Sequence, residues 1–216
     1  MKKQQRRPAR KVKRSGRPRG HSREETRRAI LAAARDCFAK NGFDRATNRD
    51  IARAAGVTAA AMYRHFDSKP ELYSAVVHEA FSELLPELRS AIASQPSARG
   101  GFRALLEGME SLDVRQHAGT KFLSELPNEM QRHPEIASRI VAAPGAVYAL
   151  VNELVETGVQ RGEIPQHKAQ RVISVIIATM MGVAGYANTL GWGLGKHAVA
   201  GFLDLLEGGL FGSFDA

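Results

Sequence analysis

Basic side chains gather at the start of the chain, where they could bind a polyanion. Residues 1–23 hold eleven Lys or Arg and no Asp or Glu, a net charge of +11, whereas the other 193 of the 216 residues sum to −2. A block of like charge repels itself and cannot bury a core, so it is typical of a disordered arm for nucleic acid or an anionic membrane surface. The overall charge of +9 is therefore a property of this arm.

A second group of residues that could carry chemistry surrounds Ala55-Gly56-Val57. A glycine turn between two short helical segments, with Ile51 and Met62 as shared core, meets the needs of a helix-turn-helix. The second helix would present free backbone amides and the Thr58 hydroxyl to a phosphate. Taken alone, such a pair is equally typical of an ordinary helical corner.

The histidines and the cysteine offer little for catalysis or metal binding. Asp113 and His117 share a helical face, but no HExxH, Cys-x-x-Cys, Gly-x-Ser-x-Gly or phosphate-binding loop accompanies the seven histidines. We therefore expect no catalytic residue, no metal site, no cofactor and no enzymatic activity. Cys37 is interpreted as an inert buried thiol, and a single cysteine without an N-terminal apolar segment favours the cytoplasm.

Helix start and stop signals recur along the whole chain, and they predict an all-α fold. Capping boxes or cap residues begin helices at Ser22, Thr47, Thr58 and Ser68, and Asn41-Gly42 ends the first of them. After residue 96, longer apolar helices are expected at about 97–116, 118–131, 134–161, 167–190 and 197–211. Pro144 is expected to kink or split the third of these.

About fifty consecutive residues, from Thr26 to Val77, closely resemble a known DNA-binding domain, that of the TetR (tetracycline repressor) family of bacterial transcription regulators. The residues that carry the resemblance are Ile30-Leu31-x-Ala33-Ala34-x-x-x-Phe38, Asn41-Gly42-Phe43, Thr47-x-x-Asp50-Ile51-Ala52, Ala55-Gly56-Val57, Met62-Tyr63-x-His65-Phe66, Ser68-Lys69 and Leu72.

The resemblance implies an arm at 1–21, a three-helix DNA-binding domain at 22–69, and a helical ligand-binding and dimerisation domain at 70–216. It further implies a regulator, expected to be a repressor, that binds a palindromic operator in double-stranded DNA as a homodimer. A small-molecule effector would release it, and the protein would be associated with the nucleoid.

The roles of individual residues follow from the same resemblance. Thr47, Thr58 and Lys69 would contact phosphates, Tyr63 and His65 would flank the DNA backbone, and Arg49 would read a guanine. The recognition helix departs from the family pattern, because it begins Thr58-Ala59-Ala60-Ala61 where members often have a lysine or polar residue and a glycine. Methyl groups contact thymine but cannot donate to bases. We therefore expect Arg49 and Arg64, with apolar contacts from Ala59 and Ala61, to supply most of the specificity.

Within the arm, Gly16-Arg17-Pro18-Arg19-Gly20 resembles the core of an AT-hook, in which Arg17 and Arg19 would enter an A·T minor groove. The match is incomplete because Ser15 replaces the arginine expected before Gly16. The alternative, equally open, is a solvated tail that only raises non-specific affinity.

The C-terminal segments have a different expected role. By resemblance, the helices near 167–190 and 197–211 would pair with their copies in a second subunit. Residues 172–195 carry no charge, and this fits a helix that is covered on most sides. By length alone the same segment could span a bilayer, so a membrane-anchored basic protein is one alternative function, although its glycines and polar residues disfavour insertion. A helical enzyme with an unfamiliar site is the other.

The resemblance also implies an effector site in the helices between the DNA-binding domain and the dimer helices. The residues there predict an uncharged, largely apolar ligand, although they could equally form ordinary core. The candidate lining residues are Phe102, Leu106, Met109, His117, Phe122, Met130, Tyr148 and Asn152.

Overall fold

The computed structural model describes residues 22–115, 117–190 and 192–207, and for some residues within helices, among them Met109 and His117, it describes the backbone alone. Arg17 and Arg19 of the predicted arm lie outside the described residues. The described part is helical and holds no strand, which confirms the all-α prediction.

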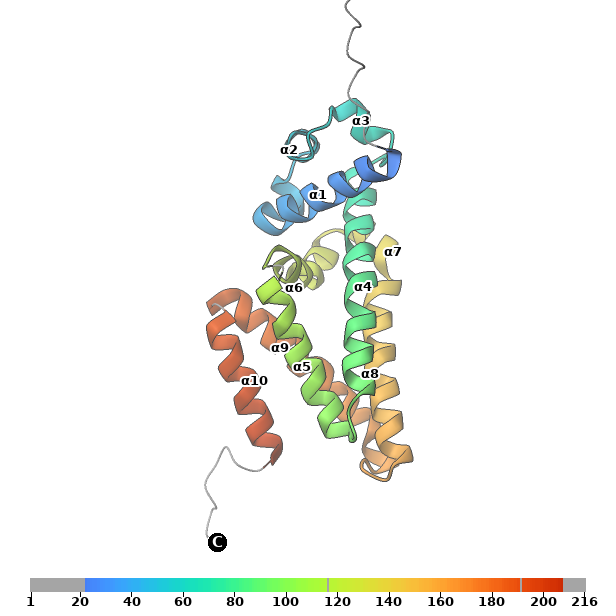
Figure 1. Ribbon diagram of the computed structural model, residues 1–216, viewed down its shortest axis with the longest axis vertical. Coiled ribbons are helices and arrows are strands. Elements are labelled where there is room, and N and C mark those ends of the chain that lie inside the picture. The colour runs from blue at the N-terminus through green and yellow to red at the C-terminus, as the bar shows by residue number, and fades with distance from the viewer. Residues whose placement is uncertain (1–21, 116, 191, 208–216) are drawn as a thin grey trace, which may run out of the picture.

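Three helices form one end of the molecule: α1 (Arg23–Arg45), α2 (Asn48–Ala54) and α3 (Ala59–Tyr63) (Figure 1). Each begins at the predicted cap. Ser22 and Glu25 form a complete capping box, while Thr47 and Thr58 accept hydrogen bonds from the amides of Asp50 and Ala61. Such caps satisfy amides that have no partner inside the helix.

The sequence predicts that the first helix ends at Asn41-Gly42, whereas in the structure it kinks at Gly42 and continues to Arg45. Gly42 has φ of 72°, a left-handed conformation that glycine adopts without the steric cost of a side chain. One further turn, which ends at Arg45, follows the glycine and buries Phe43 beneath it. The chain therefore enters the helix-turn-helix from a turn that is packed into the core.

The long helix α4 (Lys69–Ala93) leads from this end into the rest of the fold (Figure 1). The helices α5 (Ala98–Arg115), α6 (His117–Arg132), α7 (Pro134–Ile140) and α8 (Ala142–Gln160) follow. A 3₁₀ turn, η1 (Gln166–Lys168), then precedes α9 (Ala169–Leu190) and α10 (Trp192–Glu207).

Two further boundaries, in the second half of the chain, also differ from the prediction. The segment 134–161 is divided into α7 and α8 at Val141, three residues before Pro144, because a proline is tolerated within the first turn of a helix. The last helix begins at Trp192 and not at residue 197.

Two apolar clusters hold the molecule together. The first, here called the junction core, joins α1, α2 and α3 to α4, α6 and α7 through residues that include Leu31, Phe38, Tyr73, Phe122 and Ile136. The second, the distal core, joins α4 and α5 to α8, α9 and α10. Because the junction core crosses the predicted boundary at residue 69, the DNA-binding helices and α6 pack as one body.

No single helix of the described segments is both long and apolar enough to cross a membrane. The helix pair Pro134–Ile140 and Gly145–Gln160, bent by 47°, would meet the requirement only when the two are taken together.

Candidate nucleic-acid interface

The turn between α2 and α3 has the geometry of a helix-turn-helix. The amide of Ala55 donates to Ile51 O and that of Val57 donates to Ala52 O, both at 2.9 Å, while Gly56 adopts φ of 68°. Ile51, Ala52 and Met62 are buried between the two helices. The short turn and the buried contacts fix the angle at which α3 leaves α2.

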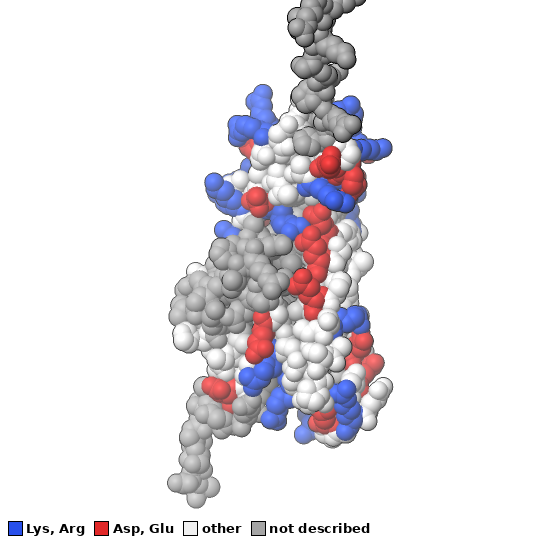
Figure 2. Space-filling view, viewed as in Figure 1, with Lys and Arg blue, Asp and Glu red and all other residues white. Residues whose placement is uncertain are grey.

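Most of the predicted contact residues lie on the surface of this end of the molecule. Basic side chains surround the end, and a column of acidic side chains runs below it on the face that Figure 2 shows. Ala61 and His65 are half-buried, and the exposed members are Thr47, Arg49, Thr58, Ala59, Tyr63 and Arg64. These residues therefore lie, exposed or half-buried, along one continuous segment that runs from the cap of α2 to just beyond α3.

The two predicted threonine contacts differ in whether the hydroxyl proton is already donated within the protein. Thr47 Oγ1 accepts from the Asp50 amide at 3.1 Å and donates its proton to Asp50 Oδ2 at 2.6 Å. Thr58 Oγ1 accepts from the Ala61 amide at 3.1 Å. In the described residues the Thr58 hydroxyl proton has no recorded acceptor, so Thr58 is the better placed of the two to donate to a phosphate oxygen.

Asn48 is a residue of this surface that the sequence did not single out. Its amide nitrogen Nδ2 donates to Tyr63 Oη at 2.8 Å, which links the start of α2 to the end of α3. Because the tyrosine oxygen accepts this bond, its own proton can be directed to a DNA phosphate. No local spacing signal predicts the contact, since it depends on the turn between the helices.

Lys69, predicted to contact a phosphate, points toward the junction between α1 and α4. Its Nζ donates to Asp44 O at 3.0 Å and lies 4.4 Å from the centre of the Phe43 ring. Burial lowers the pKa of its ammonium group, and the nearby Asp44 and Glu129 oppose that shift. The phosphate contact stays a prediction, and it would compete with these partners.

The predicted effector residues belong to different parts of the interior. Phe122 and Met130 pack in the junction core, while Phe102 and Leu106 are buried in the distal core. Tyr148 is exposed on α8. Asn152 donates from Nδ2 to Glu156 Oε1 at 2.7 Å, and the side chains of Met109 and His117 lie outside the described atoms.

A cavity of about 250 Å³ lies at the opposite end of the molecule from α1–α3, and it is lined by residues of α4, α5 and α8 that the sequence did not predict. Its walls include apolar side chains of Ile92, Leu150 and Leu154 and the polar groups of Arg89 and Arg161. Both arginines are engaged, Arg89 with Glu153 and Arg161 with Pro96 O.

The described residues contain no group of three or more His, Cys, Asp or Glu side chains arranged to hold a metal ion. Cys37 is half-buried on α1, and burial raises the pKa of its thiol, with smaller contributions from Asp50 and Asp36. A raised pKa keeps the thiol protonated and poorly reactive at neutral pH.

Comparison with known proteins assigns this surface to a family. Residues 30–76 match the family described as "Bacterial regulatory proteins, tetR family", and this range covers α2 and α3 entirely. The chain belongs to the TetR family. Its helix-turn-helix is thus the DNA-binding element of a transcription regulator, and the protein is not an enzyme.

Relatives extend the similarity of this TetR-family chain beyond that element. The chain is 27% identical over 164 residues to the HTH-type transcriptional activator FasR of Mycolicibacterium smegmatis, covering 76% of this chain and 73% of FasR. It is 23% identical over 189 residues to the HTH-type transcriptional repressor AcnR of Corynebacterium glutamicum, covering 88% and 94%. The crystal structure of FadR from Bacillus subtilis in complex with stearoyl-CoA has the same fold, with a TM-score of 0.70, 19% identity and coverage of 85% and 99%.

Proposed function

We propose that this chain binds a palindromic operator as a homodimer, acts as a repressor, and is released from DNA by a small, largely apolar effector. The observation that carries the proposal is the exposed, basic surface from α2 to the end of α3, which presents Arg49, Thr58 and Arg64 together. An arginine that reaches a guanine edge supplies sequence recognition, while hydroxyls and backbone amides position the phosphates.

An uncharged face of α9 supports the homodimer. Val175, Met181 and Tyr186 are exposed on this helix, each by 42% or more, and small residues lie between them. Exposed apolar side chains on a helix with no charge from Val172 to Leu190 are typical of a protein interface. A two-fold axis through this face would present two copies of α3 to two half-sites of one operator.

The effector's chemistry is inferred from the interior of the second half. Its distal core is apolar, with Phe102, Leu106 and Leu154 among the buried residues, and the FadR structure of similar fold holds stearoyl-CoA. Both observations favour a ligand with a substantial apolar part. Effector and operator must then weaken each other's binding by the same factor. Binding to chromosomal DNA would place the protein at the nucleoid.

Selection of bound sequences from random double-stranded DNA tests this function. We expect one enriched palindrome whose half-sites lie about one helical turn apart. Recovery of unenriched DNA from the full chain would contradict the proposal. Repression is then separated from activation by transcription in vitro from a promoter that carries the selected site, because the relatives include both an activator and a repressor.

A further inference from the structure

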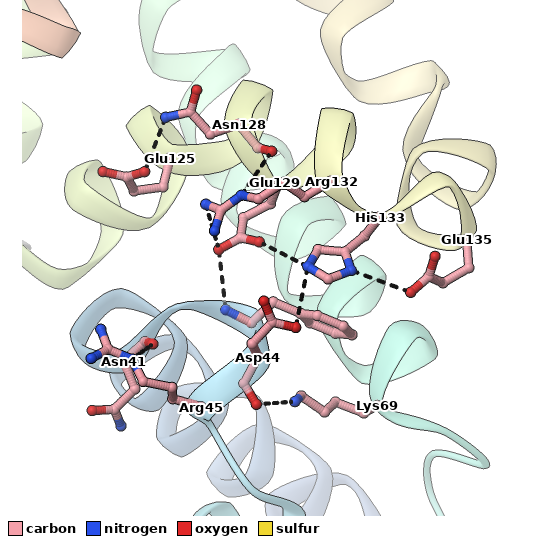
Figure 3. A network of polar contacts seen from close by, with 11 residues as sticks. Asn41, Asp44, Arg45, Lys69, Glu125, Asn128, Glu129, Arg132, His133 and Glu135 are labelled. Atoms are coloured by element: carbon pink, nitrogen blue, oxygen red, sulfur yellow. Dashed lines mark hydrogen bonds and ion pairs between the residues drawn. The ribbon is translucent and has the colours of Figure 1, made fainter.

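A buried carboxylate on α6 holds the end of α1. Glu129 is 3% exposed, and its Oε1 accepts a hydrogen bond from the Phe43 amide at 3.2 Å (Figure 3). A Cβ atom on Gly42 would also lie 3.2 Å from this oxygen, so the glycine provides room for the carboxylate as well as the turn. This contact joins residues 86 positions apart in the sequence.

Polar and charged side chains surround the buried carboxylate of Glu129. His133 Nε2 lies 3.4 Å from Glu129 Oε2 and 3.4 Å from Asp44 Oδ1, and its ring packs on Phe43 with the centroids 4.7 Å apart (Figure 3). Arg132 Nη2 lies 3.6 Å from Oε1. Neither Glu129 Oε2 nor His133 Nε2 has a hydrogen-bond partner among the described atoms, so two buried polar atoms face each other 3.4 Å apart.

A buried carboxylate with polar and charged neighbours seldom adds net stability compared with apolar side chains of the same volume, and in some proteins such a group fixes one arrangement of the surrounding elements. Here it lies between apolar residues of the junction core, next to Phe43. The carboxylate specifies where the Phe43 amide must lie, because losing that bond leaves both groups buried and unsatisfied.

Both segments that connect the helix-turn-helix to the rest of the fold converge on this point. Residues 44–46 lead from Phe43 to Thr47, the cap of α2. On the other side Lys69, the first residue of α4, donates to Asp44 O and lies over the Phe43 ring. We call Phe43, Asp44, Lys69, Glu129 and His133 the junction network.

From this arrangement we propose that Glu129 is a positioning residue for DNA binding. Its carboxylate, paired with His133, holds the Phe43 amide and thereby sets the orientation of α2 and α3 relative to α6. Glu129 itself contacts no DNA. The expected effect on operator affinity rests on the proposed function, whereas the expected effect on hydrogen exchange of the Phe43 amide does not.

The experiment compares Glu129→Ala and Glu129→Gln with Glu125→Gln in the full chain. The glutamine at 129 keeps an acceptor oxygen for Phe43 but removes the charge that faces His133. Glu125, one turn earlier on α6, bonds to Asn128 and not to Phe43, so its change to glutamine removes the same charge from the same helix. The measurements are affinity for the selected operator at several salt concentrations, thermal unfolding, and hydrogen exchange of the Phe43 amide.

We expect Glu129→Ala to weaken operator binding at least tenfold at a temperature where it stays folded, and to accelerate exchange at Phe43. The salt dependence of binding should keep its slope, because no phosphate contact is removed. Glu129→Gln should fall between Glu129→Ala and the parent, and Glu125→Gln should match the parent.

Three results would overturn the inference. The first is an unchanged operator affinity in folded Glu129→Ala, which would make the carboxylate a matter of stability alone. The second is an equal loss in Glu125→Gln, which would make the effect one of general charge. The third is slow, unaltered hydrogen exchange at the Phe43 amide in Glu129→Ala, which would show that the carboxylate does not hold this amide. If the parent protein binds no specific DNA, the proposed function fails, and the exchange measurement still tests the contact between Glu129 and Phe43.

Discussion

At the scale of single residues, we expect few side chains on the surface of α2 and α3 to recognise DNA. The exposed residues at the start of α3 include Thr58 and Ala59, and of their side chains only that of the threonine can donate a hydrogen bond. We therefore expect base recognition by hydrogen bonding to rest on the exposed guanidinium groups of Arg49 and Arg64.

Replacing Arg49 with alanine tests this division. We expect the change to cost about 1–3 kcal/mol at the selected operator and much less on random DNA, because a bidentate contact to guanine would be lost. Fluorescence anisotropy with both DNAs measures the difference. Arg139→Ala, an exposed change on α7, controls for net charge. Equal losses on both DNAs would show that Arg49 contacts a phosphate instead.

Tyr73 gives a prediction for alkaline pH. Burial raises the pKa of its phenol well above 10, and Glu129 and Glu125 add to the shift. Above pH 10 the unfolded chain therefore releases a proton that the folded chain retains, so the folded state loses stability as the pH rises.

For this one group, the free energy of unfolding should fall by about 1.4 kcal/mol for each pH unit above 10. Denaturant unfolding of Tyr73→Phe should show a shallower decline than the parent. Tyr148→Phe, which removes an exposed phenol, should decline as the parent does. A decline of the same steepness in Tyr73→Phe would contradict the assignment.

The sequence predicts local features of the site and misses the distant ones. The caps Ser22, Thr47 and Thr58 are readable because each bonds to an amide three residues away. The bond from Asn48 to Tyr63 and that from Phe43 to Glu129 join residues 15 and 86 apart, so their formation depends on helix packing that no spacing rule states.

At the scale of helices, close approach depends on glycines in the second half of the fold. A Cβ atom on Gly158 of α8 would lie 2.7 Å from Ala98 Cβ and 2.7 Å from Ile164 Cδ1. Alanine favours a helix more than glycine does, but here it would overlap α5 and the loop before η1.

We therefore expect Gly158→Ala to destabilise the protein by about 1–3 kcal/mol. Gly145→Ala on the same helix, where nothing lies within 4 Å of the added carbon, should be neutral or stabilise by up to about 1 kcal/mol. Thermal unfolding compares the two. A stable Gly158→Ala would mean that α5 and α8 separate without cost.

Local sequence signals also fail to predict some helix boundaries and the residues that line a cavity. Pro144 predicts a break within 134–161, and the break lies three residues earlier, at Val141, because proline fits the first turn of the following helix. Of the predicted effector residues, Phe122 and Met130 pack in the junction core, whereas Phe102 and Leu106 pack in the distal core. Which apolar side chains face one cavity depends on tertiary packing and not on periodicity.

At the scale of the whole molecule, the net charge differs between the segments that are expected to attract DNA and the segment that is not. Residues 1–23 carry +11, residues 24–69 carry +3 and residues 70–216 carry −5. Only the first two parts are expected to attract DNA, and the exposed α9 face lies in the third.

Deleting residues 1–20 removes ten basic side chains. We expect weaker binding and a shallower dependence on salt, because fewer counterions are released. Affinities for operators with A·T and G·C flanks then separate the two interpretations of the arm. A loss confined to A·T flanks indicates minor-groove contact by Arg17 and Arg19, while a uniform loss indicates a solvated tail. An unchanged salt slope would contradict both.

The central claim is that two copies of the α2–α3 surface bind one operator together. The most direct test is the change in affinity when about five base pairs, half a helical turn, are inserted between the half-sites of the selected palindrome. The account predicts a loss of at least about a hundredfold, since the two half-sites then face opposite sides of the DNA and only one subunit can bind specifically. An affinity that does not change would contradict it.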